Sequence, residues 1–316
     1  MVERHDHERS DPARLVSDPL VSVLMITYNQ EKYLEQAVTS VLAQQTDFAF
    51  EIVLGEDCST DGTRAIAFDL QRRHPDRVRI LFSDANVGFQ RNARRVLDAC
   101  RGAFVAILEG DDYWSDPDKL QRQVAQLQAH PEVGICISRG ERMDGAGVRH
   151  RCWDRGERDR LISMAELVRG FGMLIPTGSI VARAERLRRL PDWVFEAPVL
   201  DVFLFLGAAA PEGALYLACD TVVYRMAAEN NWSSAFARDY ELIKVDHARR
   251  MLACYDRAID SFGLNPATLR RLLSGPHHVL AKAALTERQP AAFLRHARRI
   301  HPAYVAHRIG QRLRPR

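Results

Sequence analysis

The sequence predicts an α/β fold in which a mixed, mainly parallel central sheet is flanked by helices and followed by a helical extension. Strand-like and helix-like segments alternate four times between residues 21 and 110, which is the order of a parallel sheet covered on both faces. The strand-like segments are continuous aliphatic runs, typical of strands buried on both sides. Residues 236–316 carry apolar residues at helical spacing, so we expect helices beyond the sheet.

The expected elements follow one another along the first third of the chain. Runs of β-branched and aliphatic residues predict four strands, at residues 21–26, 50–54, 78–82 and 104–108. Apolar residues at helical spacing predict helices in the connections, at about residues 34–42, at about 63–73, and in a segment that ends by residue 102. Residues 1–18 are charged, and we expect them to be a disordered lead.

Length and composition are those of a globular protein. The 316 residues suffice for one large α/β domain or two small ones, and the contents of 47% hydrophobic and 27% charged residues are ordinary. A formal net charge of +3 is too small to indicate binding to nucleic acid, and we expect no such partner. The basic excess lies at the carboxyl end, where residues 270–316 hold eleven Lys or Arg residues and one acid, Glu287.

Cysteine usage and hydropathy indicate a cytoplasmic protein. The six cysteines include no C-x-x-C pair, and the first eighteen residues lack the apolar segment of a secretory signal, so reduced thiols are expected. We find no uninterrupted apolar stretch long enough to span a bilayer. The basic carboxyl end leaves three alternatives open: peripheral contact with the inner face of the plasma membrane, a homodimer face, or a solvated helix.

The fourth predicted strand leads into the stretch FVAILEGDDYWSDP, at residues 104–117. Its three carboxylates, Glu109, Asp111 and Asp112, repel one another unless a cation or a set of donors absorbs their charge. Mg²⁺ and Mn²⁺ prefer such hard oxygen ligands, and they usually lie between one or two carboxylates and the phosphates of a substrate. The alternative is a solvated acidic turn before a helix that begins near Pro117.

Polar clusters follow three of the predicted strands, at residues 27–29, 56–61 and 109–112. In a parallel sheet these clusters share one edge, which is where open α/β sheets bind ligands. A planar base could rest on Tyr28, Asp57 could accept the imide N–H of uracil or thymine, and a pyrophosphate could reach a metal at Asp112. Each residue also has an ordinary alternative, as an interface aromatic or as a loop carboxylate.

Four segments carry a resemblance to a known family: VSVLMITYNQEKYLEQAVTSVLAQ, EIVLGEDCSTDGT, NVGFQRNARRVLDACRGAFVAILEGDDYW and DPDKLQRQVAQLQAHPEVGI. They resemble family 2 glycosyltransferases, which have the Rossmann-like GT-A fold, over about residues 20–137 and more weakly to about residue 234. The resemblance implies transfer of a sugar, with inversion, from a nucleotide diphosphate donor to a hydroxyl acceptor. The donor would be a UDP-sugar, or in some members a dTDP-sugar.

The resemblance also assigns roles to individual residues. Nucleotide-sugar contacts fall on Thr27, Tyr28, Asn29, Asp57, Arg91, Asn92 and Asp111. A divalent metal, Mn²⁺ or Mg²⁺, falls on Asp111 and Asp112, with Asp112 as the direct ligand. The family motif DDGSTDGT is here EDCSTDGT, and Cys58 puts a side chain where the loop often has none.

Inverting transfer needs a general base for the acceptor hydroxyl, on the side opposite the leaving diphosphate. In the family this base is an acid at the start of a helix in the second half of the chain. Asp201, in the segment APVLDVFLFL, matches that position, and Glu196 is the reserve candidate. The alternative is that Asp201 is a first-turn acid favoured by the helix dipole.

Two segments of the second half have alternative roles. The Arg-rich residues 140–171 are either an acceptor-side loop, in which Trp153 stacks on a sugar, or a solvated surface loop. Members of the family often have a His after the last core strand. The corresponding residues 223–234 have none, which leaves Asn230, Asn231 and Trp232 as candidate substitutes.

The resemblance implies a catalytic domain over residues 19–235, with a nucleotide-sugar half (19–115) and an acceptor half (116–235), and then a helical basic region over 236–316. The expected acceptor is a saccharide, a lipid-linked sugar or another hydroxyl compound in the synthesis of bacterial surface polysaccharide, glycolipid or glycoconjugate. A catalytically silent nucleotide-sugar binding protein is the alternative. A nucleotidyltransferase would need a Gly-rich basic loop where this chain has TYNQEKYLEQ.

Overall fold

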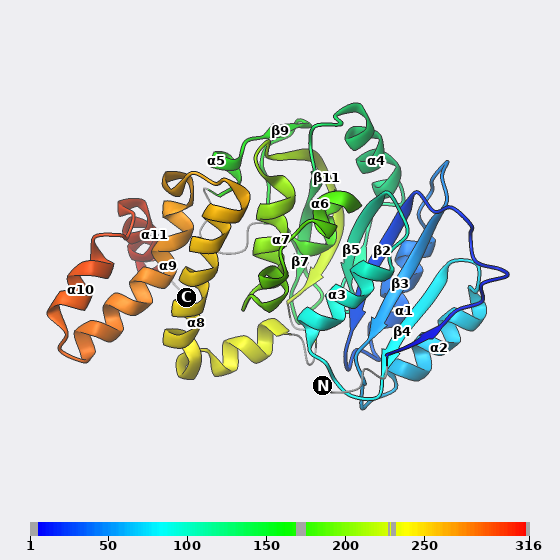
Figure 1. The fold of residues 1–316 in the computed structure, drawn as a ribbon, viewed down its shortest axis with the longest axis horizontal. Helices are drawn as coiled ribbons and strands as arrows, with labels where there is room; N and C mark the ends of the chain where they lie inside the picture. Colours follow the sequence, from blue (N-terminus) through cyan, green and yellow to red (C-terminus); the bar gives the residue numbers. More distant parts are fainter. Residues whose placement is uncertain (1–5, 169–174, 227, 229–231, 314–316) are drawn as a thin grey trace.

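A computed structural model of the chain describes residues 6–168, 175–226, 228 and 232–313 (Figure 1). Within these residues, eleven strands form one sheet. The strands are β1 (Asp6–Arg9), β2 (Val21–Thr27), β3 (Phe50–Glu56), β4 (Val78–Ser83), β5 (Phe104–Glu109), β6 (Tyr113–Trp114), β7 (Ile135–Met143), β8 (Arg149–Cys152), β9 (Arg160–Ile162), β10 (Val181–Arg183) and β11 (Ala214–Arg225).

The helices cover the sheet and extend beyond it. They are α1 (Leu34–Leu42), α2 (Thr63–Arg73), α3 (Phe89–Ala99), α4 (Lys119–Ala129), α5 (Met164–Leu167), α6 (Ala184–Arg188), α7 (Leu200–Ala209), α8 (Trp232–Phe262), α9 (Pro266–Thr286), α10 (Pro290–Ala297) and α11 (Pro302–Leu313), with the 3-10 turns η1 (Thr177–Ser179) and η2 (Asp192–Glu196).

The sheet has the strand order β1-β4-β3-β2-β5-β10-β7-β11-β6, with β8 beside β7 and β9 beside β11. Strands β4, β3, β2 and β5 are parallel, and β7 and β11 are parallel to each other. Strand β10 lies between β5 and β7 and is antiparallel to both, so β5 and β7 point the same way. The six strands β4, β3, β2, β5, β7 and β11 therefore all share one direction. The expected mixed, mainly parallel sheet with flanking helices is therefore confirmed.

The expectation of a disordered lead over residues 1–18 is wrong for residues 6–9. These residues form β1, which pairs antiparallel with β4. The physical reason is a cation on the neighbouring strand: Arg79 donates to Glu8 at 3.0 Å and to the buried Glu51 at 3.3 Å. A charged segment joins the sheet here because an opposite charge from β4 meets it.

Side chains of β2 alternate between two apolar cores, one on each face of the sheet. Val23 and Met25 join the core that includes α1, α2 and α4, whereas Leu24 joins the core that includes α3 and α7. Because both faces are covered, ligands reach the sheet mainly at the ends of its strands.

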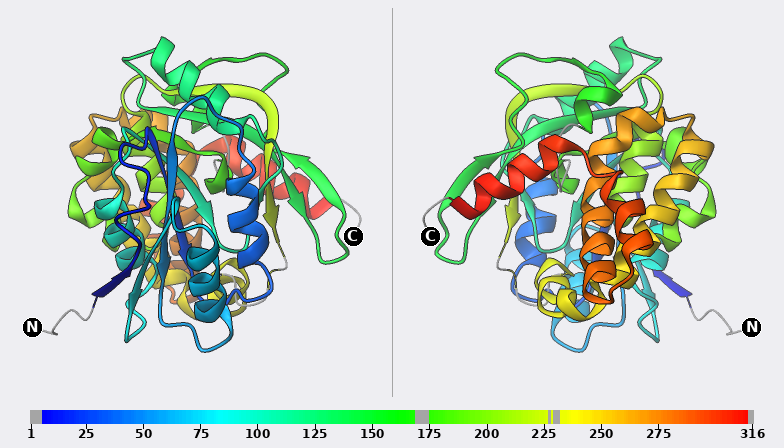
Figure 2. Two further views of the ribbon diagram at one scale, coloured as in Figure 1. Left: turned by 90° about the vertical axis from the view of Figure 1, so that its right-hand side faces the viewer. Right: turned by 90° about the vertical axis from the view of Figure 1, so that its left-hand side faces the viewer.

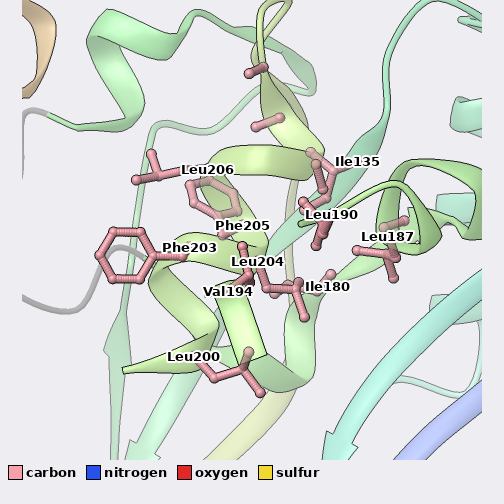
Figure 3. Close-up of a cluster of buried hydrophobic side chains, with 14 of the residues drawn as sticks. Ile135, Ile180, Leu187, Leu190, Val194, Leu200, Phe203, Leu204, Phe205 and Leu206 are labelled. Carbon is pink, nitrogen blue, oxygen red and sulfur yellow. The ribbon is translucent and has the colours of Figure 1, made fainter. Parts of the chain in front are cut away.

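Helix α7 packs into the second core and, beyond Asp201 in its first turn, is apolar all round, as a largely buried helix should be. Phe203, Leu204 and Leu206 are buried on it, and Figure 3 shows Leu204 toward Ile180, with Phe203 and Leu206 on the side away from Ile135 and Ile180. This packing fixes the direction of α7 and therefore the position of its first turn.

The carboxyl-terminal helices are joined to this core. Tyr255 of α8 packs on Phe203 with ring centroids 5.1 Å apart, and Leu269 and Leu272 of α9 belong to the same apolar cluster. Helices α10 and α11 lie farther out, at the end of the molecule away from β1 and β4 (Figures 1 and 2). None of the described helices combines the length and the apolar character needed to cross a membrane.

Candidate functional site

A cavity of about 430 Å³ opens where β2, β3 and β5 end, between α3 and the start of α7. Its polar lining comes from residues that follow these strands and from the two neighbouring helices. The polar lining residues are Thr27, Tyr28, Gln30, Asp57, Asn86, Asn92, Glu109, Asp111, Thr177, Asp201 and Tyr224. Its apolar lining includes Leu24, Ile26, Ile107, Phe195 and Leu204.

The loops after β2 and β3 hold each other at the rim of this cavity. The backbone amide of Asn29 donates to Ser59 Oγ at 3.0 Å, and the amide of Thr60 donates to Asn29 Oδ1 at 2.8 Å. Asn29 has φ 54, a left-handed conformation that Asn tolerates better than most residues. Its visible role is to join the two loops, and it leaves Tyr28 at the cavity with 39% of its surface exposed.

The Asp57 carboxylate is fixed in direction by two backbone amides. Val87 N donates to one of its oxygens at 2.8 Å and Gly88 N donates to the other at 3.0 Å. Burial raises the pKa of Asp57, and these amides oppose that rise. Because each carboxylate oxygen has a second lone pair, Asp57 can still accept a hydrogen bond from a ligand in the cavity.

Cys58, the departure from the family motif, adopts φ 59. A glycine at this position would reach the same left-handed backbone without steric cost. The substitution therefore preserves a backbone path that glycine can follow, and it adds local strain.

The two residues expected near the donor at the start of α3 lie in different surroundings. Asn92 is buried and lines the cavity, and its Nδ2 donates to the carbonyl of Gly55 at 2.8 Å. A Cβ atom at position 55 would come within 2.3 Å of Asn92 Oδ1, so Gly55 permits this close approach. Arg91 is exposed and is not among the described residues that line the cavity.

Three carboxylates meet in the cavity: Glu109 and Asp111 from the end of β5, and Asp201 from the first turn of α7. Burial, together with the negative charges of Asp111 and Asp201, raises the pKa of Glu109 to about 8. Burial also raises the pKa of Asp111 and of Asp201. Such pKa shifts on acids that face one cavity are characteristic of functional sites.

Asp112 lies apart from these three acids. It is almost fully buried, is not among the described lining residues, and accepts a hydrogen bond from the backbone amide of Arg225 at 2.8 Å. Burial and the charges of Asp111 and Glu109 raise the pKa of Asp112 well above its usual value. The chain turns after Glu109, where the amide of Asp112 donates to the carbonyl of Glu109 at 3.1 Å, and this turn carries Asp112 away from the two lining acids.

The Asp201 carboxylate lies at the amino end of α7. Its Oδ1 accepts from the amide of Val202 at 2.9 Å, and this bond and the Thr177 side chain counteract the effect of burial on its pKa. Glu196, the reserve candidate, is exposed and is not among the described residues that line the cavity. Of the two candidates, only Asp201 faces the acids of β5.

Sequence reasoning missed two residues of this site. The first is Glu109, to which the family resemblance assigns no role. Period-two alternation along β5 indicates that the side chains of Ile107 and Glu109 face the same cavity. Arg225, at the end of β11, is only 6% exposed and lies over the rings of Tyr33 and Tyr113, at 5.0 Å and 4.7 Å. Its guanidinium donates to the backbone carbonyl of Asp111 and to Gln36.

The cavity offers oxygen ligands to a divalent cation, although no preformed cage is present. Among the described residues, no group of three or more His, Cys, Asp or Glu side chains is arranged to hold a metal ion. Mg²⁺ and Mn²⁺ need only one or two protein carboxylates when a substrate supplies phosphate oxygens. Asp111 with Glu109 fits that requirement, because the cavity brings both carboxylates to the same space.

Trp153 lies near Tyr224, a residue that lines the cavity. The two rings meet edge to face, with centroids 6.3 Å apart, and Trp153 has φ 58. Several arginines of residues 140–171 are paired with acids, as Arg149 is with Glu141 at 3.5 Å. Asn230 and Asn231 lie outside the described residues, as does the side chain of Trp232.

Comparison with known sequences gives one family. Residues 22–186 match the sequence model described as Glycosyl transferase family 2. An uncharacterized protein of Mycobacterium tuberculosis is 35% identical over 218 residues, which is 68% of this chain and 61% of that protein. A Bacillus subtilis protein named as a teichuronic acid biosynthesis glycosyltransferase, TuaG, is 37% identical over 106 residues, or 34% of this chain and 41% of TuaG. The chain thus spans less than two thirds of the length of these relatives.

Two solved structures share the fold. S. aureus TarS, residues 1–349 in complex with UDP-GlcNAc, superposes with a TM-score of 0.60 at 19% identity, covering 87% of this chain and 79% of that chain. A mannosyltransferase of Pyrobaculum calidifontis, in complex with GDP-Man and Mn²⁺, superposes with a TM-score of 0.56 at 20% identity, covering 94% and 81%.

Proposed function

The chain belongs to glycosyl transferase family 2, and from this premise we propose that it transfers a sugar from a nucleotide diphosphate donor to a hydroxyl acceptor with inversion. The observation that carries the proposal is the shared cavity. Asp57 and Tyr28 line one part of it, and Glu109, Asp111 and Asp201 line another. A base-binding region and an acidic region in one cavity suit a donor that has a nucleobase at one end and a sugar diphosphate at the other.

Donor recognition starts at the base. Tyr28 offers an exposed ring for stacking, and the fixed Asp57 carboxylate offers one acceptor to the imide N–H of uracil. We therefore propose a UDP-sugar, with a dTDP-sugar as the alternative because thymine presents the same imide. Thr27 lies beside Tyr28 in the cavity, while Asn29 and Asn92 hold the loops around it. Arg91 is proposed to meet the donor from the exposed start of α3.

The diphosphate would lie against the acids of β5. Asp111 would hold a divalent cation, Mn²⁺ or Mg²⁺, with Glu109 beside it. When bound, this cation would neutralise the negative charge that develops on the leaving diphosphate. We favour Asp111 over Asp112 as the direct ligand, because the Asp112 carboxylate is engaged by the Arg225 amide. Asp112 then supports the loop that presents Asp111.

Asp201 is the proposed general base. It takes the proton of the acceptor hydroxyl as that oxygen bonds to the anomeric carbon and the bond from this carbon to the diphosphate oxygen breaks. The Val202 amide and Thr177 favour the ionised form of Asp201, which a base requires. Burial opposes ionisation, so the group keeps proton affinity for the transfer.

The relatives support a proposal for the biological setting. The name of the related B. subtilis protein, which assigns it to teichuronic acid biosynthesis, supports a role in bacterial surface polysaccharide or glycoconjugate synthesis. The acceptor would then be a saccharide or a lipid-linked sugar, and the protein would act in the cytoplasm.

The test is a thermal-shift screen of nucleotide sugars with and without Mn²⁺, followed by measurement of donor hydrolysis without acceptor. We expect a UDP-sugar to raise the unfolding temperature more with Mn²⁺ than without it, and to be slowly hydrolysed. Binding of a UDP-sugar without hydrolysis or transfer would indicate a catalytically silent binding protein. Absence of a shift with all nucleotide sugars would overturn the proposal.

A further inference from the structure

Charge is strongly segregated along the chain. Residues 270–316 hold eleven basic side chains and one acidic one, whereas the preceding residues hold 33 basic and 40 acidic ones. The formal charge is therefore +10 on the carboxyl-terminal segment and −7 on the rest. A net charge of +3 hides this contrast.

Five arginines between residues 288 and 308 are exposed and have no described acidic partner. Arg288, Arg295, Arg298, Arg299 and Arg308 are all exposed, and none forms an ion pair with another described residue. Among the described residues before position 270, by contrast, arginines are commonly paired with acids. Their positive charge is thus available to a partner.

Exposed apolar side chains lie on the same helices. Leu285 of α9, Leu294 of α10 and Val305 of α11 expose 64%, 49% and 45% of their surface. Helix α10 has no buried residue. Figure 1 shows α10 and α11 at one end of the molecule, and Figure 2, right, shows that end facing the viewer. We call the surface formed by residues 285–308 the basic end.

We propose that the basic end binds the surface of an anionic lipid bilayer. Arginines attract the negative headgroups, at about fivefold in affinity for each basic residue near the surface, and the apolar side chains enter the boundary between headgroups and acyl chains. A second copy docked through the same surface would set arginines against arginines. A nucleic acid would match the charge, but its phosphates would leave Leu285, Leu294 and Val305 unmatched.

The experiment is flotation of the full chain with vesicles of phosphatidylcholine alone and of phosphatidylcholine mixed with phosphatidylglycerol. We expect the protein to float with the mixed vesicles, to remain in solution with the neutral ones, and to bind more weakly as salt is raised. A protein that stays in solution with both, or floats equally with both, overturns the proposal.

Variants locate the surface. The triple variant Arg295→Glu, Arg298→Glu and Arg299→Glu should bind the mixed vesicles about 100-fold more weakly, since three attractions are lost. The matched control Arg72→Glu, Arg73→Glu and Arg122→Glu changes the net charge equally on α2 and α4, in exposed pairs that contribute little to stability. This control should keep most of the binding.

The pair Leu294→Ser and Val305→Ser tests the apolar part, and should reduce the binding that persists at high salt. Unfolding temperatures near that of the wild type exclude misfolding.

Equal losses of vesicle binding in the triple variant and its control would overturn the proposal. So would tighter binding to duplex DNA than to the vesicles, or a dimer that the triple variant dissociates. Donor hydrolysis in solution should be unchanged in the triple variant, so the two proposals can fail separately.

Discussion

The backbone amide of Arg225 donates a hydrogen bond to the Asp112 carboxylate at 2.8 Å, while the guanidinium of the same residue holds the carbonyl of Asp111. One residue at the end of β11 thus fixes both acids of the loop after β5. The guanidinium also lies over the rings of Tyr33 and Tyr113.

Replacing this cation should loosen the acidic loop. Arg225→Gln keeps the backbone bond to Asp112 but loses the guanidinium bonds to Asp111 and Gln36, so we expect Mn²⁺-dependent donor binding to weaken and turnover to fall about 100-fold. Isothermal titration with UDP and Mn²⁺ and steady-state kinetics measure both effects. Arg149→Gln is the control, because Arg149 also lies over Tyr113 but is half exposed. If Arg225→Gln matched Arg149→Gln in donor affinity and turnover, the loop that carries Asp111 and Asp112 would not depend on the Arg225 guanidinium.

Glu109 should make stability depend on pH. Its pKa of about 8 in the folded protein exceeds the value of 4.5 for an ordinary Glu, so the folded state holds this proton more tightly, and stability falls as pH rises from 4.5 to 8. Glu109→Gln should therefore raise the free energy of unfolding at pH 8.5 by roughly 1–3 kcal/mol. The gain should nearly vanish at pH 4.5. Urea unfolding at the two pH values measures it, and a gain that does not depend on pH would contradict the assignment.

Asp57→Asn tests base recognition. The amide group of Asn would turn a donor toward Val87 N or Gly88 N, so one half-buried N–H would lose its Asp57 acceptor, at a cost of up to about 1 kcal/mol in stability. Because the oriented acceptor is lost, UDP affinity should fall more than GDP affinity. The control Asp61→Asn alters the same loop, where Asp61 accepts from Thr63 N but does not line the cavity. Equal losses for the two nucleotides would count against base reading by Asp57.

The left-handed backbone at Cys58 predicts an unusual order of stabilities. Cys58→Gly removes the steric cost of φ 59, so its free energy of unfolding should equal or exceed that of the wild type, by up to about 1 kcal/mol. Cys58→Val should lose about 1–2 kcal/mol, because a β-branched residue suits this conformation poorly. Thermal unfolding of the wild type and the two variants under the same conditions measures this order. A Cys58→Val variant more stable than Cys58→Gly would contradict the prediction.

Much of the fold can be predicted because the strands are local apolar runs. Strands β2 to β5 lie at the expected positions, and α2 has the expected bounds, Thr63–Arg73. The sequence pattern does not indicate β1, because the charge of Glu8 is stabilised by Arg79, which is far along the chain but lies on the neighbouring strand β4. The attachment of α8 and α9 to the core of α7 depends on long-range packing that periodicity does not report.

The candidate site shows the same division between local and long-range information. The acids after β5 and the polar residues after β2 and β3 are adjacent to strands that the sequence reveals. Arg225 could not be found in this way, since its contacts with Tyr33 and Gln36 depend on the assembled sheet. Nor could sequence order decide between Asp111 and Asp112, which differ in the side of the chain that they face.

The central claim is that Asp201, and not another acid near the cavity, removes the acceptor proton. The most direct measurement compares Asp201→Asn with Glu196→Gln for donor affinity and for sugar transfer at saturating donor. We expect Asp201→Asn to bind the donor with nearly the affinity of the wild type and to lose transfer by at least about 100-fold, while Glu196→Gln retains both. Near-normal transfer by Asp201→Asn would contradict the account.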